Sequence, residues 1–158
     1  MIIATVLSLT VLLVYLLTFC MKNGIPNTIS ETYYLLNWKP LFTLVIYTSS
    51  ILILPVLMEL TPETQIIPFL GISGMLLVGT APRFKEYERS IHVLGATLAG
   101  TLSQLWIILY GCRYTLCIWI FLGMLGIRYK DNLDQVKFFF WIELVCFMLI
   151  YTNILLSI

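Results

Sequence analysis

The chain has 158 residues and a formal net charge of +1, and its composition is 60% hydrophobic but only 11% charged. Soluble domains carry about 25% charged residues, and a protein this small could not bury so much apolar surface, so a soluble globular domain is excluded. The sequence also lacks the basic patch that nucleic-acid binding requires. A single histidine and no Cys-x-x-Cys pair argue against a metal site. We therefore expect an all-α integral membrane protein without cofactor, metal or nucleic-acid partner.

Six apolar stretches organise the sequence. A membrane-spanning helix needs about 20 residues, and we expect one transmembrane domain over 1–158, a polytopic bundle of six helices. The first stretch lacks the basic residues that precede the apolar core of a signal peptide, so we expect it to be retained as a helix. The predicted helices are 2–20, 40–58, 66–81, 91–110, 114–127 and 136–158.

The basic residues are distributed unevenly over the connections between these stretches. Lys and Arg concentrate in cytoplasmic loops. Of the nine basic residues, only Arg113 lies in an even-numbered connection, on the side of the membrane opposite to the other eight. We therefore expect the odd-numbered connections in the cytoplasm and both termini outside it (N-out, C-out), in a bacterial inner membrane or an equivalent one. The other eight are in the first, third and fifth connections: Lys22, Lys39, Arg83, Lys85, Arg89, Arg128, Lys130 and Lys137.

The first connection, from 21 to 39, is the richest stretch outside the predicted helices. Thr28 and Glu31 have the spacing of a capping box. A short amphipathic helix over about 31–38 would follow, with aromatic side chains for the membrane interface. This helix either contacts lipid headgroups or only closes the bundle.

The third connection combines charge with aromatic residues. Arg83, Lys85 and Arg89 could bind lipid phosphates, or they could serve only to anchor the topology. His92 follows at the start of the fourth stretch, four residues after Glu88, so a local pair is feasible. A histidine at the membrane boundary is a candidate site residue, unless Glu88 simply anchors it there.

Small residues recur in the third and fourth stretches three or four positions apart. Such faces let helix backbones approach closely. They predict packing of the third stretch on the fourth, an interface between copies of the chain in a homo-oligomer, or the wall of a pocket. The residues are Gly71, Gly74, Gly95, Ala96, Ala99 and Gly100.

Glu143 is the one acidic residue within an apolar stretch, about 10 Å past the start of the sixth at 1.5 Å per residue. A carboxylate at that depth must be protonated, paired or hydrated. Ser103 and Gln104 are likewise polar in the middle of the fourth stretch. We expect these residues either to form an interhelical network or to line a functional polar path, with Glu143 as a proton or headgroup site.

Two short motifs resemble a known family. Ile25-Pro26-Asn27-Thr28-Ile29-Ser30-Glu31 follows the first helix, and His92-Val93-Leu94-Gly95-Ala96 opens a later one. Over about 25–110 the chain resembles the family that joins the damage-regulated autophagy modulators, the yeast suppressor-of-kinase membrane proteins and the GPI-anchor lipid-remodelling proteins. The resemblance implies a lipid-facing role and marks Ser30, Glu31, His92, Gly95 and Ala96.

Three functions are compatible with these patterns. A lipid-modifying enzyme would use Ser30 or His92 in its reacting centre. An oligomeric channel or proton-coupled carrier would have a polar path at Ser103, Gln104 and Glu143. The expectation that we adopt is a non-enzymatic protein whose partner is membrane lipid, or a membrane protein, at its cytoplasmic face. Its binding residues would be Ser30, Glu31, Arg83, Lys85, Glu88, Arg89 and His92.

Overall fold

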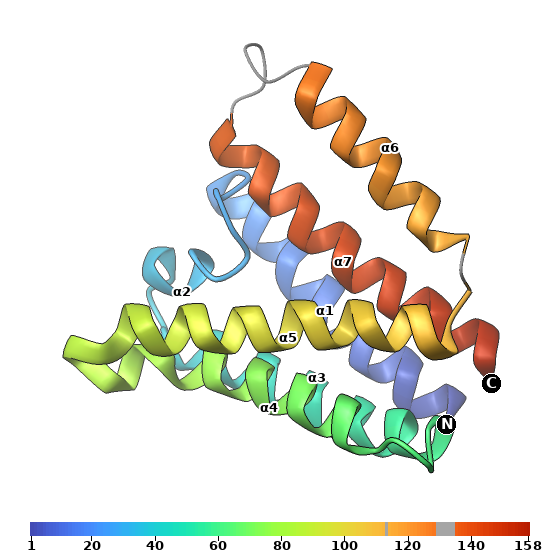
Figure 1. Cartoon of the computed structure of the whole chain (residues 1–158). Helices are drawn as coiled ribbons and strands as arrows, with labels where there is room; N and C mark the ends of the chain where they lie inside the picture. Colours follow the sequence, from blue (N-terminus) through green and yellow to red (C-terminus); the bar gives the residue numbers. More distant parts are fainter. Residues whose placement is uncertain (113, 129–134) are drawn as a thin grey trace.

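The computed structural model describes residues 1–112, 114–128 and 135–158, and all secondary structure in these ranges is helical, as predicted. Two short elements, α2 (Thr32–Leu35) and the 3-10 helix η1 (Ala81–Tyr87), accompany the long helices. The long helices of Figure 1 are α1 (Ile2–Asn23), α3 (Pro40–Leu60), α4 (Ile66–Thr80), α5 (Glu88–Tyr110), α6 (Thr115–Arg128) and α7 (Gln135–Ser157).

Four of these helices are long and apolar enough to cross a membrane: α1, α3, α5 and the Lys137–Ser157 part of α7. This marks the chain as a membrane protein. α4 and α6 are shorter, with 15 and 14 residues. The six long helices agree with the six predicted ranges to within three residues at each end.

The predicted amphipathic helix at 31–38 is only partly present. α2 ends at Leu35, and Leu36 is already extended, with φ −78° and ψ 138°. Thr32, the first residue of α2, is fully buried, whereas Tyr34 and Trp38 are exposed. Tyr33 also packs against Phe42 of α3, with ring centroids 6.0 Å apart, so the contacts with the bundle are made at the start of the predicted helix and not at Trp38.

The long helices form a wedge that is narrow at one end and wide at the other. α3, α4 and α5 lie on one side of the wedge, and α1 and α7 lie on the other (Figure 1). The narrow end, which we call the terminal end, holds both chain termini. The wide end, which we call the basic end, holds the last turn of α1, η1 and the first turns of α3, α5 and α7, and α2 lies there between the two sides.

Asn153 of α7 joins the two sides at the terminal end. Its side chain is completely buried. The backbone N–H of Cys112, just after α5, donates to Asn153 Oδ1 at 2.6 Å, and Asn153 Nδ2 donates to the Leu149 carbonyl at 2.8 Å. Both halves of the amide are therefore satisfied, which matters for a polar group buried in an apolar bundle.

α4 and α5 pack most closely of all the helices, and two glycines allow it. A Cβ atom added to Gly74 would lie 2.6 Å from the Gly95 carbonyl oxygen and 2.7 Å from Ala99 N. A Cβ atom at Gly95 would lie 2.7 Å from the Gly74 carbonyl oxygen. The two backbones thus touch directly, which is the packing that small residues permit in membrane helices.

The other small residues of this pair have looser surroundings. A Cβ atom at Gly71 would make an ordinary 3.5 Å contact with Leu102 Cβ, and one at Gly100 would meet nothing within 4 Å. Ala99 is buried, whereas Ala96 is exposed. The predicted small face therefore divides into a packing part and, at Ala96 and Gly100, an open part.

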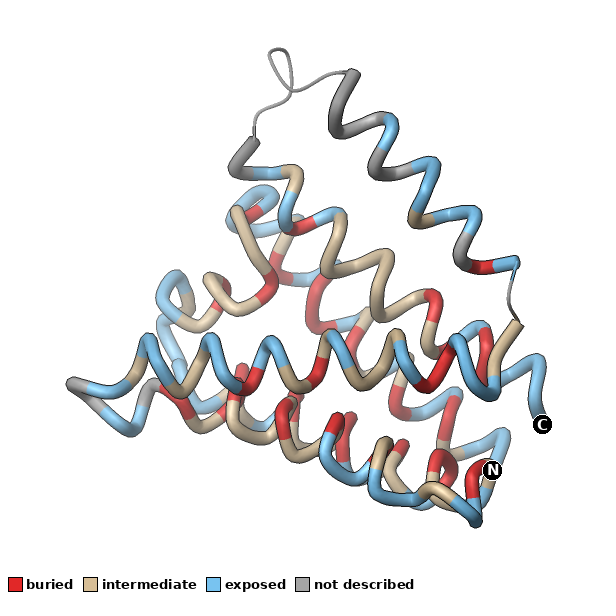
Figure 2. The backbone as a smooth tube through the Cα atoms, in the orientation of Figure 1, coloured by how far each residue is buried: buried red, intermediate tan, exposed pale blue. Residues whose placement is uncertain are grey.

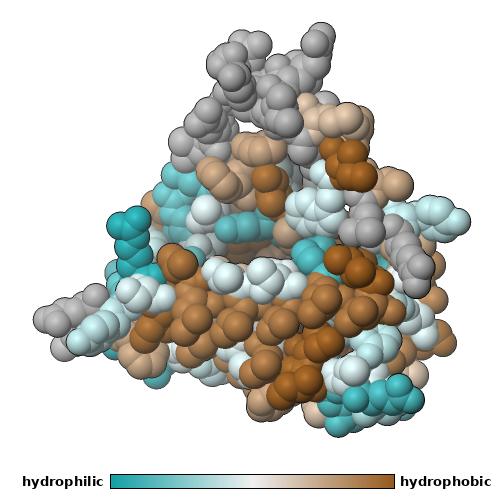
Figure 3. Space-filling model, viewed as in Figure 1, coloured by the Kyte–Doolittle hydropathy of each residue, from teal (hydrophilic) through white to brown (hydrophobic). Residues whose placement is uncertain are grey.

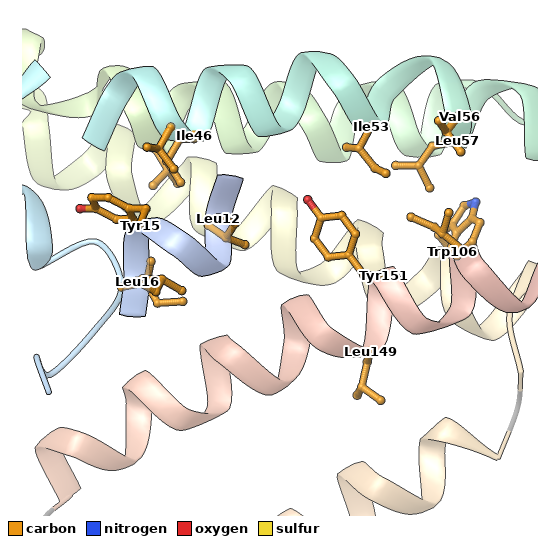
Figure 4. Packing of buried hydrophobic residues seen from close by; sticks show 14 of the residues in the cluster. Leu12, Tyr15, Leu16, Ile46, Ile53, Val56, Leu57, Trp106, Leu149 and Tyr151 are labelled. Carbon is orange, nitrogen blue, oxygen red and sulfur yellow. The ribbon is translucent and has the colours of Figure 1, made fainter. Parts of the chain in front are cut away.

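The buried residues face the centre of the wedge, and the outer faces are exposed (Figure 2). In α1, for example, Thr5, Ser8, Leu12, Tyr15 and Phe19 are buried, at the three- and four-residue spacing of one helix face. Figure 4 shows Tyr151 pointing toward α3, with Trp106 beside Leu57 near the terminal end.

Three hydroxyl groups form a closed cluster in this core. Ser8 Oγ lies 2.9 Å from Ser49 Oγ and 2.6 Å from the Tyr151 hydroxyl, and the distance between Ser49 Oγ and that hydroxyl is 2.9 Å. The two serines also donate to each other's carbonyl oxygens, at 2.8 and 3.2 Å. The cluster, which we call the hydroxyl cluster, links α1, α3 and α7.

Replacing Tyr151 by phenylalanine is expected to lower the free energy of unfolding by about 1 kcal/mol, because an interhelical hydrogen bond in a membrane protein contributes about 0.6–1.7 kcal/mol. Titration with a denaturing detergent measures the change. Tyr114→Phe, at a position 83% exposed, is the matched control. Equal stability of the two variants would contradict a linking role for the hydroxyl cluster.

Candidate functional site

A cavity of about 200 Å³ lies inside the wedge. Its walls come from α1, α3, α4, α5, α7 and the segment 24–39 that joins α1 to α3. Most of the lining is apolar; examples are Phe42, Ile46, Ile53, Leu57, Met75 and Phe147. An apolar cavity of about 150 Å³ already binds benzene in an engineered protein core, so this space is large enough for part of an apolar ligand.

The cavity follows α5 over most of its length. His92 lines it near the basic end and Trp106 near the terminal end. At 1.5 Å per residue these two positions are about 21 Å apart. The lining of the cavity therefore extends about 21 Å along α5.

Three polar side chains from three separate elements line the cavity toward the basic end: Ser30, His92 and Glu143. Ser30 belongs to the segment 24–39, His92 to α5 and Glu143 to α7. Each was predicted as a site residue, but in two different groups. We call the part of the wall that holds these three side chains the polar end of the cavity; the rest of the lining is mostly apolar.

Glu143 also binds the segment 24–39. Its Oε2 accepts a hydrogen bond of 2.6 Å from the backbone N–H of Ile29. Ile29 is buried and itself lines the cavity beside Ser30. The carboxylate thus positions the backbone that closes the basic end.

A second chain of hydrogen bonds fixes the same segment to α1. The Tyr15 hydroxyl donates to Thr32 Oγ1 at 2.5 Å, and Thr32 Oγ1 donates to the Ile29 carbonyl at 2.6 Å. Both backbone groups of Ile29 are therefore paired, one to α7 and one to Thr32. Gly24 makes the preceding turn possible, since its φ of 81° is favourable only for glycine.

Thr32→Val is expected to loosen this segment, because it removes both hydrogen bonds of Thr32 without changing its shape. With about 1 kcal/mol lost for each bond, amide hydrogen exchange of residues 29–36 should accelerate about tenfold or more. Thr101→Val, on the exposed face of α5, is the control. Unchanged exchange at 29–36 would show that Thr32 does not fix the segment.

The cavity reaches the surface between α5 and α7. Ala96 lines the cavity and is nevertheless exposed. In Figure 3 the surface is hollowed between the α5 side chains and α7.

The predicted headgroup cluster is divided in the structure. Glu31 accepts hydrogen bonds from Asn27 N at 2.5 Å and Asn27 Nδ2 at 2.9 Å, and its own N–H donates to Thr28 Oγ1 at 3.1 Å. It therefore stabilises its own turn, much as a capping box does. Only Ser30 and His92 of the predicted cluster line the cavity.

The two arginines of that cluster lie elsewhere. Arg83 is exposed, and Arg89 lines a separate shallow pocket with Val93 and Thr97, none of which borders the cavity. The side chain of Lys85 lies outside the part of the chain that the structure describes. These arginines are therefore not part of the cavity's polar end.

Glu88 and His92 interact electrostatically, as the predicted pair requires, but not through a hydrogen bond of the buried Glu88 oxygen. Glu88 Oε1 is buried and accepts no hydrogen bond within the described ranges. His92 is half-buried, with the cavity on one side.

The predicted polar network is also divided. Gln104 Oε1 accepts a hydrogen bond of 2.8 Å from Trp119 Nε1 of α6, and Ser103 Oγ donates to the Gly100 carbonyl at 2.9 Å. Within the described residues no hydrogen bond joins either to Glu143. Ser103 does line the cavity, whereas Gln104 does not.

Sequence reasoning missed the hydroxyl cluster and Asn153. Ser49 and Tyr151 of that cluster line the cavity at mid-depth, so they are part of the site. The only sequence signal for these residues was their polarity within apolar stretches. That signal could not show which residues, more than forty positions apart, would be hydrogen-bonded to one another. Comparison of the chain with protein-family models, with curated proteins and with solved structures gave no match.

Proposed function

We propose that this membrane protein binds a lipid or similar amphiphile inside its helix bundle, with the apolar chain in the cavity and the polar head at Ser30, His92 and Glu143. The observation that carries the proposal is a single cavity with an apolar body and a polar end. Known ligand sites share this pattern of largely apolar walls with a few placed polar groups. The function is binding, without chemical conversion of the lipid.

Burial supports the same function. The cavity walls at Phe42, Ile46 and Trp106 are at most 2% exposed, so a ligand chain there would be shielded from the surface. The lateral opening near Ala96 would allow entry from the bilayer. Lipid is already apolar, so no hydrophobic driving force favours transfer of the chain from the bilayer into the cavity. Close packing of the chain against the cavity walls favours the transfer instead.

We also propose that all six long helices cross the membrane and that the basic end faces the cytoplasm. Lys22, Lys39, Arg83 and Arg89 lie at that end, which supports this orientation. Arg113 and Lys130, also used in the charge count, lie outside the described residues. A tag fused at Ile158 should be cleaved by protease added to intact cells; a protected tag would contradict the orientation.

Native mass spectrometry of the purified protein tests the binding function. After repeated exchange into short-chain detergent, the folded protein should retain a lipid that a denaturing step releases. A folded but lipid-free protein that also fails to rebind added lipid would contradict the proposal. Flux through liposomes that Glu143→Gln abolishes would instead favour a channel or carrier.

A further inference from the structure

The polar end of the cavity is acidic, and this restricts the headgroup that it can accept. Resting on the proposed binding function, we infer that the ligand carries a hydrogen-bond donor without negative charge at its polar end, an amine or a hydroxyl, and that Glu143 recognises it. The basic residues of the third connection led us to expect a phosphate headgroup, but the acidic polar end of the cavity excludes phosphate there.

The charges around the cavity carry the inference. Among the described residues that line the cavity, Glu143 is the only acid, His92 is the only other titratable group besides Cys146 and Tyr151, and there is no lysine or arginine. A phosphate bound here would meet the carboxylate without a cation to compensate it. Burying the charge of a phosphate without a compensating cation costs several kcal/mol.

The hydrogen bonds of Glu143 agree with a donor-bearing ligand. Its Oε2 accepts the Ile29 N–H, whereas a carboxylate has about four acceptor sites in total. The remaining capacity suits an ammonium or hydroxyl group. His92 and Ser30 line the same cavity and can also accept hydrogen bonds, through an imidazole nitrogen and a hydroxyl oxygen.

None of four other charged groups of this end, Glu31, Glu88, Arg83 and Arg89, lines the cavity. The Glu31 carboxylate is already bound by Asn27, and Glu88 Oε1 adds a second buried acidic oxygen nearby. Arg89 lies in the separate shallow pocket, and Arg83 is exposed. Both arginines can still attract anionic lipid to the surface, but they do not reach the cavity lining.

Three single-chain probes with the same chain, brominated at its far end, test the inference. Their heads are a primary amine, a glycerol and a monophosphate. With the protein in phosphatidylcholine nanodiscs, bromine in the cavity should quench Trp106, which lines its far part. The relevant signal is the saturable quenching that disappears in Trp106→Phe.

The amine and glycerol probes should bind at least about tenfold more tightly than the phosphate probe. Glu143→Gln keeps an oxygen for the Ile29 N–H but removes the charge, so it should reduce the preference for amine over phosphate at least about tenfold and affect glycerol less. The double variant Arg83→Gln, Arg89→Gln should leave the order unchanged.

The outcomes separate the two claims. If the phosphate probe binds as tightly as the amine, or if Glu143→Gln retains the preference, the headgroup inference is wrong while lipid binding stands. If no probe quenches Trp106 saturably, the proposed function fails, and the inference fails with it.

Discussion

Replacing Gly74 or Gly95 by valine is expected to lower the free energy of unfolding by at least about 3 kcal/mol, the largest stability effect of any single change in this protein. The added Cβ atom alone would lie 2.6–2.7 Å from a carbonyl oxygen of the partner helix. Backbone cannot rotate away as a side chain does, so α4 and α5 must separate.

Thermal unfolding followed by size-exclusion chromatography measures this loss. For a protein of about 150 residues, 3 kcal/mol corresponds to a fall in Tm of roughly 6–12 °C. Gly100→Ala is the matched control, since its Cβ atom would meet nothing within 4 Å. It should be neutral or stabilising, because alanine is favoured over glycine in a helix by about 1 kcal/mol. A Gly95→Val protein as stable as this control would contradict the α4–α5 packing.

Gly100→Phe is expected to weaken ligand binding at least about tenfold, which corresponds to 1.4 kcal/mol or more. Gly100 lines the cavity, and a side chain added there enters open space. The phenyl ring would therefore occupy volume that the ligand chain needs, without displacing any backbone. The stability of the protein should change little, so binding and folding can be measured separately.

Thr101→Phe provides the control for this change. Thr101 is the next residue of α5, is exposed, and does not line the cavity. Binding of the amphiphile probes, measured by saturable quenching, should stay within about twofold of the wild type in this variant. Equal affinity of Gly100→Phe and Thr101→Phe would show that the chain binds outside the cavity.

The helices could be predicted from the sequence because length and hydropathy alone determine where an apolar helix can form. The close approach of α4 and α5 was also predictable from Gly74 and Gly95, since spacing places small residues on one face. The failure at α2 has a different origin. A helix over 31–38 has adequate local signals, but its length depends on tertiary contacts that Thr32 makes and Trp38 does not.

The candidate site was only partly predictable. His92 and Glu143 could be identified because polar residues are costly in apolar helices. The contacts of these two residues could not be predicted, since Glu143 and its partner Ile29 are 114 positions apart. Arg89 was grouped with His92 because the two are near in sequence. In the structure, however, Arg89 lines a separate pocket with Val93 and does not line the cavity.

Photo-crosslinking with an amphiphile that carries a diazirine at the far end of its chain tests the central claim most directly. After illumination in nanodiscs, the labelled residues are identified by peptide mass spectrometry. We predict labelling of the buried residues Leu57 and Trp106 at the terminal end of the cavity, and its loss in Gly100→Phe. Labelling confined to exposed apolar residues such as Ile51 and Leu105, unchanged in that variant, would show that the chain remains in the bilayer and never enters the bundle.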